Sequence, residues 1–143
     1  MIQNGNRQLL SRGNSLNMTQ SDNTNRNEMG SPRFGDICDV NLDPVVGAEI
    51  GKRRPALIVS NNANNTYSPR ITVLPITSRP TDDNYPFEAI VPKDTGGLTA
   101  TSRILANQIR TIDKKRLVSL RGTLPPDYIP RVEKAIKIHL NMK

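Results

Sequence analysis

The sequence predicts a mainly β domain that ends in an α-helix. From residue 34 onward, short apolar stretches rich in β-branched residues alternate with turn signals, which is typical of a small antiparallel β domain. Near the C-terminus the apolar residues change to a helical spacing, with Ile129, Val132, Ile136 and Leu140 on one face. The 143 residues suffice for one such domain and a tail.

The first 32 residues are expected to form a disordered tail, and residues 33–143 the folded domain. Residues 1–32 are crowded with Asn, Ser, Gln and Gly, and their few apolar residues show no sustained period. Three arginines and two acids give this segment a charge of +1, so the basic character belongs to the folded part. Met29 is a second candidate for the start of the chain, and the intact mass of the native protein distinguishes it from Met1.

Six strands are expected, separated by loops rich in Gly, Pro, Asn and Asp. Their ranges are 34–40, 54–60, 70–76, 87–91, 102–112 and 117–121. The polar run 61–66 is expected to form one helical turn, because Asn and Ser cap helices well but are poor in their interiors. The final helix is expected to begin between Pro125 and Pro130, with Pro130 in its first turn and Asp127 as its cap.

The composition narrows the classes of partner and chemistry. A net charge of +7 and a pI near 10.0 favour a polyanionic partner, whether nucleic acid, acidic protein or membrane surface. Cys38 has no partner for an internal disulfide and is expected to be a small buried side chain in a strand, which suits a reducing cytoplasm. One Cys and one distant His do not make a zinc site, so we expect neither metal nor cofactor. No apolar run reaches the length of a membrane span, and we expect a cytoplasmic protein.

Several short blocks of the sequence resemble the MazF/PemK toxins. They are Phe34-Gly35-Asp36-Ile37, Leu42-Asp43-Pro44-Val45-Val46-Gly47-Ala48-Glu49, Lys52-Arg53-Arg54-Pro55, Pro75-Ile76-Thr77-Ser78 and Gln108-Ile109-Arg110-Thr111-Ile112-Asp113. The match extends from about Arg33 to the C-terminus, and it is specific because the blocks share both order and spacing. The resemblance implies an SH3-like antiparallel barrel with a C-terminal α-helix, the CcdB/PemK-like fold. It also implies a homodimer whose two-chain groove carries RNA.

The activity implied by this resemblance is that of an endoribonuclease toxin, or mRNA interferase. Such an enzyme cleaves single-stranded RNA at specific sequences without a metal. The 2′-hydroxyl attacks the adjacent phosphorus and leaves a 2′,3′-cyclic phosphate and a 5′-hydroxyl. The implied protein partner is a MazE-like antitoxin whose acidic, flexible tail lies across the basic groove and blocks it.

Three residues are the candidates for catalysis. Pro55 biases Arg54 toward an extended conformation at the entrance of a strand, and a guanidinium matches phosphate oxygens. The resemblance adds Thr77, whose hydroxyl can donate to phosphate or orient the attacking group, and Glu49, which matches an acidic position of the family and is the candidate base. From local signals alone, Arg54 also fits a solvated surface charge and Thr77 a loop-opening residue.

Six further residues are candidates for binding RNA: Lys52, Arg53, Asn61, Ser78, Asn107 and Gln108. Some members of the family have an acid where this chain has Asn107, so no carboxylate base is available there, although an amide can read a base edge or a phosphate. His139 falls in the last turn of the final helix, where a helix-end role is expected rather than catalysis.

Two alternatives to a nuclease stay open at this point. One is a non-catalytic CcdB-like toxin that binds gyrase, and the other is an RNA-binding barrel without nuclease activity. The effect of CcdB depends on a C-terminal tryptophan, and this chain contains no Trp. No residue code connects the loops to bases, so the sequence that is cut does not follow from the sequence of the protein.

Overall fold

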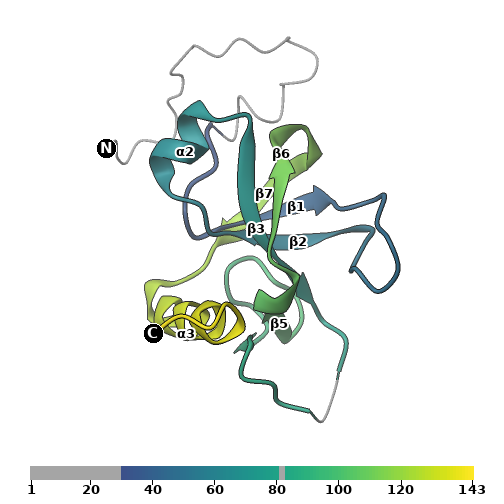
Figure 1. Cartoon of the computed structure of the whole chain (residues 1–143), viewed down its shortest axis with the longest axis vertical. Coiled ribbons are helices and arrows are strands. Elements are labelled where there is room, and N and C mark those ends of the chain that lie inside the picture. The colour runs from purple at the N-terminus through teal and green to yellow at the C-terminus, as the bar shows by residue number, and fades with distance from the viewer. Residues whose placement is uncertain (1–29, 81–82) are drawn as a thin grey trace.

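The computed structural model of the chain describes residues 30–80 and 83–143, which form an antiparallel seven-stranded sheet with short helices at its ends (Figure 1). The predicted tail therefore lies outside the described residues, apart from 30–32. The strands are β1 (Asp36–Asn41), β2 (Arg53–Ile58), β3 (Arg70–Thr77), β4 (Glu88–Val91), β5 (Ser102–Leu105), β6 (Arg110–Asp113) and β7 (Leu117–Thr123). The helices are α2 (Asn62–Tyr67) and α3 (Ile129–His139), with 3₁₀ turns η2 (Ala106–Gln108), η3 (Lys114–Arg116) and η4 (Pro126–Tyr128).

The strand order is β4-β5-β3-β2-β1-β7, and β6 pairs with the other half of β3. All the neighbouring strands are antiparallel, so the mainly β class predicted from the sequence is confirmed. Figure 1 shows α2 and α3 at opposite ends of the sheet.

One predicted strand is in fact two. The range 102–112 divides into β5 and β6, because β3 pairs with β5 through its last two residues and with β6 through its first four. The break lies opposite Leu74 and Pro75, and Pro75 has no N–H to offer to a ladder. The chain crosses this gap as η2, which brings Asn107 and Gln108 out of the sheet.

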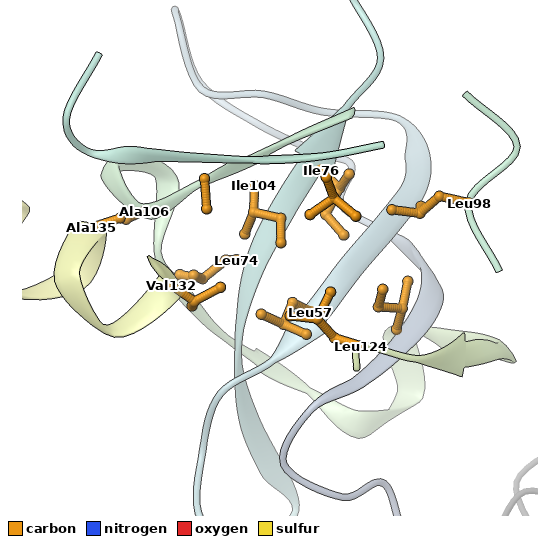
Figure 2. Close-up of a cluster of buried hydrophobic side chains, with 12 residues drawn as sticks. Leu57, Leu74, Ile76, Leu98, Ile104, Ala106, Leu124, Val132 and Ala135 are labelled. Atoms are coloured by element: carbon orange, nitrogen blue, oxygen red, sulfur yellow. The ribbon is translucent and has the colours of Figure 1, made fainter. Parts of the chain in front are cut away.

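Both faces of the central strands are buried, which explains their almost continuous apolar runs. One cluster lies between the sheet and α3 and includes Leu57, Leu74 and Val132 (Figure 2). The other lies on the opposite face and includes Cys38, which is 0% exposed as predicted. Burying a side chain of the size of Leu or Val contributes roughly 1.5–3 kcal/mol to the free energy of folding. The two clusters therefore hold the sheet rigid beneath its loops.

The C-terminal helix docks on the first cluster through Val132 and Ala135, which are both buried. Pro130 lies in the first turn, as predicted. The prediction that Leu140 belongs to the apolar face was wrong, because α3 ends at His139 and Leu140 is 46% exposed.

The predicted cap of this helix was also wrong. Asp127 lies inside η4, and α3 continues directly from that turn with Tyr128 as its N-cap and no side-chain cap. The N–H groups of Tyr128 and Ile129 donate to the carbonyls of Pro125 and Pro126 instead. The 3₁₀ turn thus supplies the acceptors that a capping carboxylate would have supplied.

The polar turn after β2 forms as predicted and becomes α2. Asn61 is its N-cap, and its side-chain oxygen accepts a hydrogen bond from the N–H of Asn64 at 2.8 Å. Across residues 30–80 and 83–143, no helix is both long enough and apolar enough to cross a membrane.

Candidate active-site groove

A groove of about 570 Å³ lies where the β1–β2 loop meets the end of β3, the strands β4 and β5, and η2. Its position follows from the fold, because the break between β5 and β6 places η2 beside that loop. Six of the predicted site residues line it: Glu49, Lys52, Arg54, Thr77, Asn107 and Gln108. Segments far apart in the sequence thus meet at one polar surface.

Arg54 is the second residue of β2, opposite Val40 of β1. The extended conformation predicted for it is confirmed, although the strand begins one residue earlier than expected. Its Nε donates to the carbonyl of Gly51 at 2.8 Å, which anchors the half-buried side chain. Within the described part of the chain no other hydrogen bond or ion pair holds this guanidinium, so its terminal nitrogens are available to a ligand.

Thr77 is the last residue of β3 and is half-buried. Its hydroxyl oxygen accepts a hydrogen bond from the backbone N–H of Arg79 at 3.2 Å. A hydroxyl has one proton to donate, and an oxygen that already accepts from the backbone keeps that proton for another partner. Thr77 is therefore prepared to donate into the groove.

Glu49 is exposed on the β1–β2 loop, and its Oε1 accepts from the N–H of Val46 at 2.8 Å. The base of the loop is closed by the N–H of Lys52, which donates to Oδ1 of Asp43 at 2.8 Å. Lys52 has a φ of 70°, in the left-handed region. The carboxylate of Glu49 thus retains a second oxygen that faces solvent at the groove.

The β1–β2 loop is attached to the rest of the domain by side chains that come much later in the sequence. Gln108 accepts from the N–H of Ile50 at 3.2 Å, so the oxygen of this predicted RNA-binding side chain is already used inside the protein. Arg110 donates to the carbonyl of Leu42 at 2.8 Å. These contacts hold the loop that carries Glu49 against η2 and β6.

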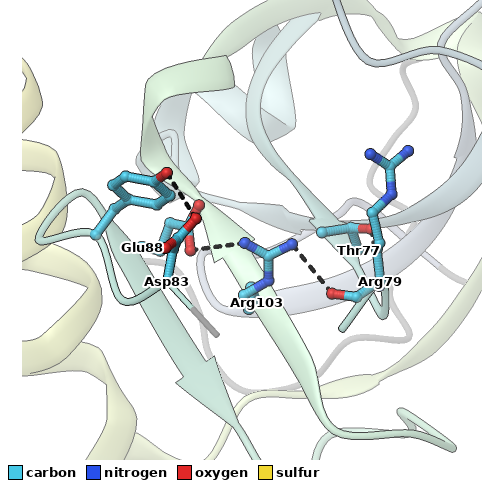
Figure 3. Close-up of polar contacts among 6 residues, drawn as sticks. Thr77, Arg79, Asp83, Glu88 and Arg103 are labelled. Carbon is cyan, nitrogen blue, oxygen red and sulfur yellow. Dashed lines mark hydrogen bonds and ion pairs between the residues drawn. The ribbon is translucent and has the colours of Figure 1, made fainter. Parts of the chain in front are cut away.

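Four charged groove residues were not predicted as site residues: Asp43, Arg79, Glu88 and Arg103. Arg103 and Glu88 form an ion pair at 2.9 Å, with 15% and 7% of their side chains exposed (Figure 3). For Glu88 and Arg103 the only signal available was a charged residue in each of two short apolar strands, β4 and β5. Together with Glu49, Lys52 and Arg54, these four residues give the groove four cationic and three acidic side chains.

Three predicted RNA-binding residues do not line the groove: Arg53, Asn61 and Ser78. Arg53 precedes Arg54 in the strand and therefore projects to the other face. Asn61 caps α2. His139 is exposed at the end of α3, as expected for a helix-end residue, and does not line the groove.

Tyr85 lies in the segment before β4 and lines a second hollow, which shares Glu88 with the groove. Its hydroxyl donates to Oδ2 of Asp83 at 3.0 Å, and its ring stacks on Phe87 at 5.1 Å between centroids. The hydrogen bond to Asp83, together with the negative charge of that carboxylate, raises the pKa of Tyr85 above 10.0. Among residues 30–80 and 83–143, no cluster of three His, Cys, Asp or Glu side chains is suited to hold a metal ion.

The chain is similar to known proteins over nearly all of the folded part. Residues 33–140 match the family described as PemK-like, MazF-like toxin of type II toxin-antitoxin system. The chain is 36% identical over 115 residues to Endoribonuclease MazF9 of Mycobacterium tuberculosis, which covers 77% of this chain and 97% of that protein.

Solved structures show the same fold. MazF of Deinococcus radiodurans superposes with a TM-score of 0.69 at 31% identity, over 78% of this chain and 98% of that one. A MazE-MazF structure from the same organism gives a TM-score of 0.62 at 28% identity, over 79% and 98%. These likenesses define the molecule as a small antiparallel β toxin with a C-terminal helix and confirm the fold class expected from the sequence. The chain belongs to the PemK-like, MazF-like toxins of type II toxin-antitoxin systems, and it is an endoribonuclease.

Proposed function

We propose that this endoribonuclease cleaves single-stranded mRNA at specific sequences without a metal ion, by attack of a 2′-hydroxyl on the adjacent phosphorus. The bond between O2′ and phosphorus forms while the bond from phosphorus to O5′ breaks. One proton leaves the 2′-hydroxyl and one reaches O5′, so the products are a 2′,3′-cyclic phosphate and a 5′-hydroxyl. The observation that carries the proposal is that Arg54, Thr77 and Glu49, from three separate segments, line the same groove.

In this mechanism Arg54 stabilises the transition state. Negative charge grows on the nonbridging oxygens as five oxygens come to surround the phosphorus, and a guanidinium already in place lowers the energy of that state. The bond from its Nε to Gly51 reduces its freedom while leaving both terminal nitrogens for the phosphate. Thr77 donates its remaining proton to a phosphate oxygen, since its own oxygen is occupied by Arg79.

Glu49 is the proposed general base for the 2′-hydroxyl. A carboxylate at the rim of the groove can accept this proton through the oxygen that Val46 does not use. Lys52, Arg79 and Asn107 are the groove side chains proposed to bind the RNA backbone and bases.

We also propose that the working form is a homodimer in the cytoplasm and that a MazE-like antitoxin neutralises it. Ile90 of β4 and Ile138 of α3 are 43% and 42% exposed and lie at one shared hollow, so pairing of two copies there would cover apolar surface. A net charge of +7 suits an acidic antitoxin segment. MazF of Deinococcus radiodurans, which has the same fold, has been solved as MazE-MazF.

The test is cleavage of a long RNA by the purified protein in EDTA, followed by analysis of the new ends. Discrete fragments with cyclic phosphate ends are expected. Arg54→Ala is expected to lower the cleavage rate by on the order of a hundredfold or more. Arg53→Ala is the matched control, because it removes the same charge from the neighbouring position outside the groove. Equal rates for the two variants, or fragments that require a divalent ion, would overturn the proposal.

A further inference from the structure

We propose that Arg103 is a positioning residue for RNA cleavage, because its guanidinium holds the hydroxyl of Thr77 in its working orientation through the backbone of Arg79. The inference rests on the proposed function, in which Thr77 donates to the phosphate. It concerns a residue that does not touch RNA itself.

The register of the sheet places Arg103 beside Thr77. In β5, Arg103 stands opposite Thr77 of β3 on one side and Ile90 of β4 on the other. Residues directly opposite one another project from the same face of a sheet. The neighbouring residues Ile76 and Ile104 are opposite each other as well, and both are buried in the core on the other face. Arg103 and Thr77 therefore share the groove face.

From this position the side chain of Arg103 connects β4 to the segment that follows β3 (Figure 3). Its Nη1 donates to Oε1 of Glu88 at 2.9 Å, on β4. Its Nη2 donates to the carbonyl of Arg79 at 3.0 Å, two residues beyond the end of β3. The planar fork of arginine suits two acceptors in fixed directions, which a lysine cannot satisfy in the same way.

The backbone of Arg79 completes the connection to the hydroxyl. The carbonyl of Arg79 is held by Arg103, and the N–H of the same residue donates to the hydroxyl oxygen of Thr77 at 3.2 Å. Fixing the carbonyl restrains the rotation of this segment and so keeps the N–H aimed at Thr77. The proton of Thr77 is then directed away from Arg79 and toward the groove.

Arg103 is poorly placed to bind RNA directly. Its side chain is only 15% exposed, one N–H of each terminal nitrogen already has an acceptor, and its Nε is buried without a hydrogen-bond partner among the described residues. Neutralising Glu88 does not by itself explain why an arginine stands at position 103. Two apolar residues of similar volume in place of Arg103 and Glu88 would avoid both the buried charges and the unpaired Nε. Arg103 makes a second contact, to the carbonyl of Arg79, which its ion pair with Glu88 does not explain.

The main test compares the cleavage kinetics of Arg103→Met with the wild type, on an RNA that the wild type cuts. The rate at saturating RNA is expected to fall by about 10- to 100-fold, since a misplaced catalytic group costs this much, while KM changes little. The dependence of binding on salt is expected to stay the same, because no phosphate contact is lost. A KM increase with a salt slope lowered by about one would mean that Arg103 binds phosphate, and would overturn the inference.

A double-mutant cycle with Thr77→Val tests the connection itself. Once the hydroxyl is absent, Arg103→Met is expected to cause no further loss of rate, because it acts through that hydroxyl. Additive losses, or a wild-type rate for Thr77→Val alone, would contradict the inference.

Thermal unfolding shows whether Arg103→Met folds. If it does not, two conservative variants test the same inference. Arg103→Lys preserves the charge but not the fork, and is expected to stay well below the wild-type rate. Glu88→Gln preserves an acceptor for Nη1 and leaves the bond to Arg79, so it is expected to retain most of the rate. Full activity of Arg103→Lys would overturn the inference about Arg103 and leave the proposed function standing. A wild-type protein that cuts no RNA would overturn both.

Discussion

Replacement of Gln108 by Leu separates two roles for a side chain that lines the groove. The oxygen of Gln108 accepts from the N–H of Ile50, which ties the β1–β2 loop to η2 across 58 residues of sequence. Leucine has nearly the same size but offers no acceptor, so the variant removes this bond and little else. If the side chain serves mainly as a tie, its loss loosens the loop; if it serves mainly to bind RNA, the loop is unaffected.

The expected size of the effect follows from the contact. One neutral hydrogen bond contributes about 1 kcal/mol net, which corresponds to roughly a fivefold change in the population of the opened loop. The loop keeps its other attachments through Asp43 and Arg110, so the global fold is expected to remain. For a domain of this size the melting temperature is expected to fall by no more than about 3–6 °C.

Amide hydrogen exchange measures this directly. In Gln108→Leu the N–H of Ile50 is expected to exchange about fivefold faster, because its acceptor is gone. The N–H of Leu42, which donates to the carbonyl of Lys52 at 2.9 Å, is the internal reference and is expected to stay unchanged. Asn107→Ala is the matched control, since Asn107 also lines the groove but makes no hydrogen bond to the loop. Unchanged exchange at Ile50 in Gln108→Leu would refute the reasoning.

Two further predictions concern the titration of a tyrosine and the tolerance of glycine positions. Asp83→Asn is expected to lower the pKa of Tyr85, because the carboxylate of Asp83 raises that pKa in the wild type. The raised pKa stabilises the wild-type fold below pH 10.0, and this stabilisation is lost as the pH rises and the phenol ionises, so the variant is expected to lack it. The tyrosinate absorbance of Asp83→Asn minus that of the wild type, between about pH 9 and 12, measures this because Tyr67 and Tyr128 are common to both proteins, and an unchanged titration would contradict it. Gly97→Ala is expected to cost at least about 2 kcal/mol of unfolding free energy, because φ is 83° and the new Cβ would collide with the backbone carbonyl of Arg121. Gly47→Ala, at φ 57° in open space, is expected to cost only about 1 kcal/mol, and equal losses in denaturant unfolding would show that the collision does not matter.

Much of the secondary structure was predictable because its signals are local. The apolar runs, the polar turn at Asn61 and the position of Pro130 are properties of a few adjacent residues, and the structure agrees with each. The division of 102–112 was not predictable in the same way. It depends on where β3 pairs with each half of this segment, and pairing joins residues that are distant in sequence.

The sequence by itself determined the class of the molecule: a mainly β domain with a final helix, its basic character, and the Arg54 and Thr77 motifs that indicate a MazF-like toxin. These follow from residue types and from short spacings along the chain. Only the tertiary structure decided which side chains share the groove and which are used elsewhere. It placed Arg103 beside Thr77, paired the side-chain oxygen of Gln108 with the N–H of Ile50, and placed Arg53 outside the groove. The physical reason is that sheet register and side-chain hydrogen bonds are made between segments tens of residues apart, and no local pattern encodes them.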